Sequence, residues 1–171
     1  MNFYELIDLI KQIIDNNEFT NKITFGDLSD VDLNKETTFP LLHLMVEQVT
    51  IQERTMEYRL NVIAADIVDK MQYDIDDSEI GSEFDEFYGK DNVQDIMATQ
   101  LQVTTTLVNA LRQLDLVDNN FTRLQDEPVA TPFKDRFENE IAGWESTITL
   151  KKRQSGASGS GGESVGAGGN C

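Results

Sequence analysis

Alternating apolar and polar residues dominate the stretch from Thr38 to Asp69, which predicts two long strands joined by a tight polar turn at residues 52–54. In the second strand the apolar residues expected on one face are Met56, Tyr58, Leu60, Val62 and Ala64. The first strand has apolar residues on both faces as far as Glu47, which predicts that it is the more central of the two. We expect the rest of the chain to cover this hairpin.

Two other segments have apolar residues at the three- and four-residue spacing of an amphipathic helix. The first covers residues 2–16, and its apolar stripe consists of Phe3, Leu6, Ile7, Ile10, Ile13 and Ile14. The second runs from Asp91 to Asp115 and keeps the helical period for nearly seven turns. Asp91 and Gln94 form a candidate capping box at its start. The first stripe is expected to pack on the sheet; the alternative is that it docks on a partner.

Three shorter segments are predicted strands, at residues 23–25, 121–124 and 143–152. The last of these alternates cleanly and should pair antiparallel to the hairpin. Pro128 and Pro132 predict an extended connection before it. The order helix, short strand, hairpin, helix and strand predicts an α+β domain, with an antiparallel sheet built on the long hairpin and helices packed on one face.

The 171 residues are enough for one domain, expected at residues 1–153. Within it, residues 70–90 are predicted to form an acidic loop, either solvated or wrapped around a neighbouring subunit, because Phe84, Phe87 and Tyr88 interrupt the charges. Residues 154–171 are rich in glycine and serine and predict a flexible C-terminal arm.

The charge balance excludes some partners. Thirty-one acidic and fourteen basic residues give a net charge of −17, which argues against a nucleic-acid-binding or anionic-membrane surface. Cys171 is the only cysteine, so neither an intrachain disulfide nor a cysteine zinc site is possible in a monomer. The sequence has no leader-like start and no apolar run long enough to span a bilayer, so we expect a soluble protein made in a cytoplasm.

Candidate chemical groups are few. His43, the only histidine, lies among apolar strand residues and is expected in a core or an interface rather than in catalysis. The spacing of Asp27, Asp30 and Asp32 suggests calcium, but the glycine turn and closing glutamate of a calcium loop are missing, so turn and capping roles are expected. Glu138 and Glu140 could act as an acid–base pair, but carboxylates are too abundant here to single them out. The sequence therefore predicts no catalytic, cofactor-binding or metal-binding residues.

Three stretches resemble a known family: FGDLSDVDL at residues 25–33, TTFPLLHLMVEQVTIQERTMEYRLNVIAADIVD at residues 37–69, and TPFKDRFENEIAGWESTITL at residues 131–150. Together with the terminal Asn-Cys they are similar to small virion proteins of crAss-like and related phages of Bacteroidetes hosts, which resemble tail terminator or tail-completion proteins. The chain departs from the family pattern in its longer segment after the hairpin and in its Gly/Ser-rich arm.

The resemblance implies a tail-terminator-like fold and a structural role in the virion, with assembly in the host cytoplasm. It implies a homo-oligomeric ring at the neck or tail top, in contact with other neck, portal or tail proteins, and with DNA only as the genome passes through the lumen. The excess of carboxylates would then repel DNA phosphates near the channel wall. The alternative is a soluble acidic regulator or inhibitor that mimics nucleic acid; an enzyme is the least favoured class.

Overall fold

The computed structural model describes residues 3–15, 17–30, 38–69, 91–117, 123–134 and 140–153. The predicted acidic loop at residues 70–90 and the arm at residues 154–171 lie outside these ranges. The described elements, in chain order, are α1 (Phe3–Ile14), β1 (Lys22–Phe25), the 3-10 helix η1 (Leu28–Asp30), β2 (Leu41–Ile51), β3 (Thr55–Ile67), α3 (Val93–Val117), β4 (Arg123–Leu124), β5 (Ala130–Lys134) and β6 (Ile141–Arg153).

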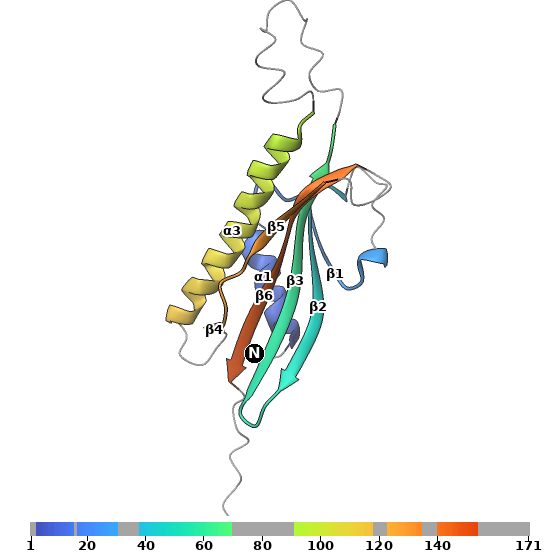
Figure 1. Cartoon of the computed structure of the whole chain (residues 1–171). Coiled ribbons are helices and arrows are strands. Elements are labelled where there is room, and N and C mark those ends of the chain that lie inside the picture. Colours follow the sequence, from blue (N-terminus) through green and yellow to red (C-terminus); the bar gives the residue numbers. More distant parts are fainter. Residues whose placement is uncertain are drawn as a thin grey trace, which may run out of the picture.

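The hairpin of β2 and β3 forms the middle of one sheet, as its alternation predicts (Figure 1). The strand order is β1-β2-β3-β6-β4, with β5 also paired to β6. The α+β prediction is confirmed, with two differences. The sheet is mixed, because β1 runs parallel to β2. The prediction that the first hairpin strand is the more central was wrong: β3 lies in the middle and pairs along its whole length with β6.

A β-bulge explains the apolar pattern of β2. Val46 pairs with Leu60 and Gln48 pairs with Arg59, so Glu47 is an extra residue in the strand. The inserted residue shifts the alternation by one position. Val49 therefore points to the same face of the sheet as Leu44 and Val46. In a regular strand it would point to the opposite face, because it is three residues after Val46.

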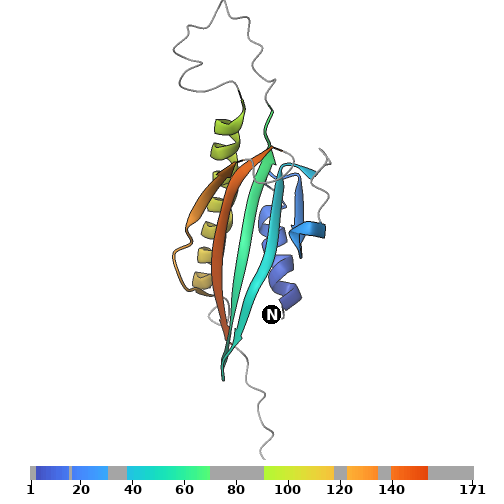
Figure 2. The same ribbon diagram turned by 45° about the vertical axis from the view of Figure 1, so that its right-hand side comes forward.

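Both helices pack on one face of the sheet (Figures 1 and 2). The buried core on this face combines α1 and α3 with the apolar residues of the three long strands. Its members are Leu6, Ile10, Ile14, Leu42, Leu44, Tyr58, Leu60, Val62, Ala64, Val103, Leu107, Val108, Leu111, Ile148 and Leu150. The predicted helix stripe and the predicted β3 face thus meet in one core, and packing on the sheet is confirmed as the role of the α1 stripe.

The other face carries a second, smaller core. It consists of Phe39, Leu41, Ile63, Ala65 and Ile141, flanked by Leu28, Met45, Ile67 and Phe133. Every one of these residues belongs to one of the three stretches that carry the family resemblance. Burial of these side chains holds η1, the hairpin, β5 and β6 together on the face opposite the helices.

The connection with two prolines contains a strand that the sequence pattern did not predict. Residues 130–134 form β5, which pairs antiparallel with residues 142–146 of β6. Pro132 is tolerated there because β5 lies at an edge of the sheet, where one side of a strand needs no hydrogen bonds.

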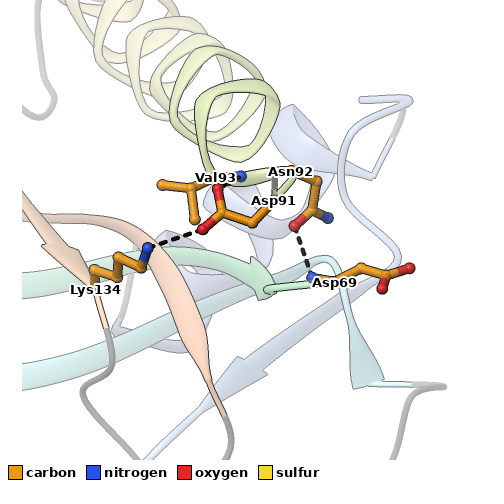
Figure 3. A network of polar contacts seen from close by, with 5 residues as sticks. All are labelled: Asp69, Asp91, Asn92, Val93 and Lys134. Carbon is orange, nitrogen blue, oxygen red and sulfur yellow. Dashed lines mark hydrogen bonds and ion pairs between the residues drawn. The ribbon is translucent and has the colours of Figure 1, made fainter. Parts of the chain in front are cut away.

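Asn92 and Asp91 fix the start of α3 against the end of β3 (Figure 3). The backbone N–H of Asp69 donates to Asn92 Oδ1 at 2.7 Å, and Asn92 Nδ2 donates to the carbonyl of Ile67 at 3.3 Å. One Asp91 oxygen accepts from the Val93 N–H at 3.3 Å, and the other is 3.0 Å from Lys134 Nζ. The two ends that flank residues 70–90 are therefore held side by side, and the capping role predicted for Asp91 is confirmed.

Candidate functional site: the two flanks and the open face of the sheet

Four large apolar side chains gather on the helix side of the sheet, towards the hairpin turn. We call this set, Tyr4, Phe25, Val49 and Ile51, the apolar corner. Tyr4 is 77% exposed and Ile51 is 72% exposed, values unusual for side chains of this size. Exposed apolar groups that cluster in this way mark interaction surfaces more often than scattered ones do.

Ring contacts hold the apolar corner in place. The Phe3 ring, in the first turn of α1, lies 6.1 Å from the Tyr4 ring, 5.8 Å from the Phe25 ring and 5.8 Å from the Tyr58 ring. Tyr58 is directly opposite Val49 in the hairpin. Phe3 therefore links Tyr4 and Phe25 to Tyr58, and the Phe3 and Tyr58 rings are stacked.

The β-bulge places Val49 and Ile51, the two residues that β2 contributes to the apolar corner, on the helix side of the sheet. Without the extra residue Glu47, Val49 and Ile51 would face the other side of the sheet. The sequence does carry a sign of this, because two polar residues, Glu47 and Gln48, interrupt the alternation between Val46 and Val49. Sequence reasoning missed the corner, since it used this interruption only as the end of a two-sided apolar run.

The opposite flank of the sheet is acidic. Residues 125–129, which we call the acidic strap, connect β4 to β5 along the outer side of β6 (Figure 2). The Gln125 N–H donates to the Thr149 carbonyl at 3.0 Å and fixes the start of the strap. Asp126 and Glu127 are exposed, and Val129 is 74% exposed. This flank thus combines two carboxylates with one prominent apolar side chain.

Between the acidic strap and the sheet lies a polar groove of about 620 Å³ on the face opposite the helices. It is lined by Gln48, Thr50, Glu57, Arg59, Asp126, Glu127, Val129, Thr131, Glu145, Ser146, Thr147 and Thr149. The Arg59 Nε is 2.9 Å from a Glu47 carboxylate oxygen, and Asn61 Nδ2 donates to Glu145 Oε1 at 2.7 Å. The groove is lined mainly by hydroxyls and carboxylates, with Arg59 as its one basic lining residue.

Basic residues concentrate at the hairpin end of the sheet. Arg54 is exposed in the turn, and Lys151 and Lys152 lie opposite Glu57 and Met56 in the adjoining strands. We call Arg54, Lys151 and Lys152 the basic tip. In a chain of net charge −17 this places a local positive charge next to the apolar corner.

His43 is fully buried on the face opposite the helices. Its Nδ1 lies 2.7 Å from the Thr24 hydroxyl in the neighbouring strand, whereas its Nε2 has no hydrogen-bond partner among the residues that the structure describes. Burial lowers the pKa of His43, while the Gly26 backbone and the Asp27 carboxylate act in the opposite direction. The core position predicted for this histidine is confirmed, and the ring is inaccessible to a substrate.

Of the three aspartates considered for calcium, Asp27 caps η1. Its Oδ1 accepts a hydrogen bond from the Ser29 N–H at 3.0 Å, and this bond lowers the pKa of the Asp27 carboxyl. Asp32 lies outside the described residues, as does Glu138, the proposed partner of Glu140. Within the described part of the chain, no group of three histidine, cysteine or acidic residues is placed to hold a metal ion.

No helix in the described ranges is long and apolar enough to cross a membrane. Comparison of the sequence with protein-family models and with curated proteins finds no match.

Proposed function

We propose that this chain is a structural protein of a tailed-phage particle, and that its copies form a ring at the neck or at the top of the tail. The ring would join the portal and head to the tail and let the genome pass through its lumen. The three family-like stretches support this proposal. They supply β2, β3 and most of β5 and β6, and their side chains build the second core between them.

The observation that carries the proposal is the difference between the two flanks of the sheet. One flank has the apolar corner beside the basic tip, and the other has the acidic strap with Val129. A cyclic ring of more than two copies has heterologous interfaces, in which each copy offers two different surfaces. A chain with two unlike exposed flanks meets that requirement.

The buried polar chemistry also fits a structural role. His43, the residue type most often used as a general base, has its ring closed off in the core by β-strand neighbours. The polar groove has a chemically uniform lining, because most of its lining residues are threonines or carboxylates. These features support contact with other proteins as the function of the surface.

The direct test of the proposed function is whether the chain is part of the phage particle whose genome encodes it, and where it lies there. We expect mass spectrometry of purified particles to detect the chain, and we expect antibody labelling in the electron microscope to mark the junction of head and tail. Particles that assemble fully without the chain would contradict the proposal. A monomeric protein that binds tightly to a DNA-handling enzyme would instead support the acidic regulator.

A further inference from the structure

We infer that the outer edge of β2 accepts an extended segment of a neighbouring copy, residues 71–76, which adds one strand to the sheet. This inference rests on the proposed ring and adds to it the residues of one interface. The acceptor edge belongs to the described part of the chain, and the donor segment lies outside it.

The sheet is incomplete beside β2. Strand β1 pairs with β2 only from Leu41 to Leu44, and it ends at Gly26, which has a φ of 125°. From Met45 to Ile51, β2 has no strand on its outer side in the described part of the chain. The bulge at Glu47 interrupts this open edge, so its regular part is residues 48–51. Such an edge presents backbone N–H and C=O groups to another chain.

The hairpin turn determines which residues present these backbone groups. The Gln52 N–H donates to the Thr55 carbonyl at 2.8 Å. Bonded and non-bonded pairs alternate along an antiparallel ladder, so Thr50 bonds to β3, whereas Val49 and Ile51 direct their N–H and C=O groups outward. The side chains of the same two residues belong to the apolar corner. Their backbone and side-chain groups therefore lack the same neighbour.

One added strand would cover the whole apolar corner. Phe25 lies beside Leu44 on the helix side, and Ile51 lies at the other end of the open edge. The β3 partners of Leu44 and Ile51 are six residues apart, about 20 Å, which is the length of a six-residue strand. Alternate side chains of that strand would pack against Phe25, Val49, Ile51 and Tyr4 and remove them from water.

Residues 71–76, with the sequence MQYDID, have the alternation that this edge requires. In an extended conformation Met71, Tyr73 and Ile75 lie on one face, and the polar side chains lie on the other. The apolar face matches the apolar corner, and the polar face matches the side of β2 that lines the polar groove. The other aromatic residues between β3 and α3 are spaced three residues and one residue apart and do not alternate.

The length of the chain excludes the donor's own copy. Tyr58, the partner of Val49, is nine residues from Ile67 at the end of β3, about 30 Å along the strand. Tyr73, in the donor segment, is six residues beyond Ile67 and extends at most about 22 Å from it. The segment therefore fits the edge of a second copy and not its own.

Donor and acceptor lie at opposite ends of each copy, which gives the heterologous contact that a ring requires. Hydrogen bonds between Asp69 and Asn92 hold the two ends of residues 70–90 together, at the end of the sheet farthest from the hairpin turn (Figures 1 and 3). Residues 70–90 contain seven acidic residues and two lysines, whereas the acceptor end carries the basic tip. Glu5 and Glu53 lie at the acceptor end and oppose this attraction, so we assign the specificity to the alternation.

Two variants, each lacking one half of the contact, test the pairing. Tyr73→Asp puts a charge on the apolar face of the donor, and Ile51→Asp puts one in the acceptor corner. We expect each variant alone to assemble at least about a hundredfold more weakly than the wild type. A mixture of the two keeps one intact donor and one intact acceptor. Native mass spectrometry should therefore detect a 1:1 heterodimer and nothing larger.

Matched controls make the result specific. Phe87→Asp lies in the same segment but outside residues 71–76, and Leu101→Asp changes an exposed apolar side chain of α3. Both should assemble as the wild type does. Hydrogen exchange gives a second reading: the amides of Val49 and Ile51 should exchange slowly in the wild-type assembly and rapidly in Tyr73→Asp, because a paired strand protects them.

The outcomes separate this contact from the ring itself. If the wild type assembles but the mixture gives no heterodimer, or either variant alone assembles as the wild type does, this pairing is wrong and the ring stands. A heterodimer without slow exchange at Val49 and Ile51 would overturn the added strand. If the wild-type chain remains a monomer at every concentration, the inference and the proposed function both fail.

Discussion

Gly26 and Gly143 place opposite demands on the backbone. Gly26 has a φ of 125°, a region that residues with a side chain rarely adopt, yet there is open space around the position of a Cβ. Gly143 faces Ala65 in the β3–β6 pair, and a Cβ there would overlap the carbonyl oxygen of Ala64 and lie 2.8 Å from the Cα of Ala65. The first position is limited by conformation and the second by space.

The same substitution at both glycines should therefore destabilise the fold for different reasons. We expect Gly26→Ala to reduce the free energy of unfolding by about 1–2 kcal/mol through backbone strain. Gly143→Ala should reduce it by about 3 kcal/mol, because β6 must move away from β3. Urea denaturation measures both values. A Gly143→Ala protein with the wild-type midpoint would contradict the close packing of these strands.

His43 should make stability depend on pH in a narrow range. Burial lowers its pKa in the folded chain below the ordinary value of about 6.5, so the fold favours the neutral ring. The stabilisation is complete above pH 6.5 and is lost as the pH falls from there towards the lower folded pKa. Because His43 binds one proton, its contribution to the free energy of unfolding should fall by at most about 1.4 kcal/mol per pH unit.

Denaturation of the wild type and of His43→Gln at pH 7.5 and pH 5.5 tests this dependence. The variant can differ in absolute stability, so the comparison is between the two pH slopes. We expect the slope to be nearly flat in His43→Gln. Equal slopes in the two proteins would show that His43 does not bind the proton concerned.

At the scale of elements, the Asn92 side chain contributes two of the hydrogen bonds that join β3 to α3. Asn92 accepts from the Asp69 N–H at 2.7 Å and donates to the Ile67 carbonyl at 3.3 Å, so its amide joins the end of a strand to the start of a helix (Figure 3). The first turn of α3 then reaches Val68 and Ala142 through Ile96, in a small core at this end of the sheet.

Asn92→Ala removes both side-chain hydrogen bonds of this junction and keeps the bond from the Asn92 N–H to the Asp69 carbonyl. We expect a loss of about 1–2 kcal/mol in the free energy of unfolding. Asn109→Ala is a matched control, since Asn109 is exposed in the middle of α3 and alanine favours helix more than asparagine does. The control should unfold at or slightly above the wild-type midpoint. Equal losses in the two variants would contradict a special role for Asn92.

The elements that could be predicted are those whose own residues show the apolar spacing of a helix or the alternation of a strand. The stripe of α1 and the alternation of β3 and β6 depend on neighbouring residues, so their faces were correct. The central position of β3 and the parallel pairing of β1 depend on contacts between distant segments, which alternation does not encode. Strand β5 was missed because Pro132 argues against a strand unless its edge position is known.

The candidate site could be predicted only in part for the same reason. The burial of His43 follows from its apolar neighbours. The apolar corner combines the first turn of α1, the end of β1 and the bulged half of β2, and no local pattern shows that these three lie together. The acidic strap is visible as a polar segment, but its position on the flank opposite the corner follows from the strand order.

At the scale of the whole molecule, the two faces of the sheet are covered differently. The helices cover one face, and the second core and the polar groove occupy the other. Strands β1 and β2, which carry Phe25, Val49 and Ile51 of the apolar corner, lie at the edge of the sheet opposite β4 and the acidic strap (Figure 2). The account therefore predicts that assembly, rather than any chemistry within one copy, is what these surfaces support.

Native mass spectrometry of the full-length chain tests this claim most directly. The account predicts one dominant species whose mass is a whole multiple, greater than two, of 19.3 kDa, and whose copy number does not change over a dilution series, because a closed ring has no free ends. Ile51→Asp should shift the protein towards the single chain, since a charge would then be buried in the interface. A wild-type protein found only at 19.3 kDa, or in an open-ended series of masses, would contradict the account.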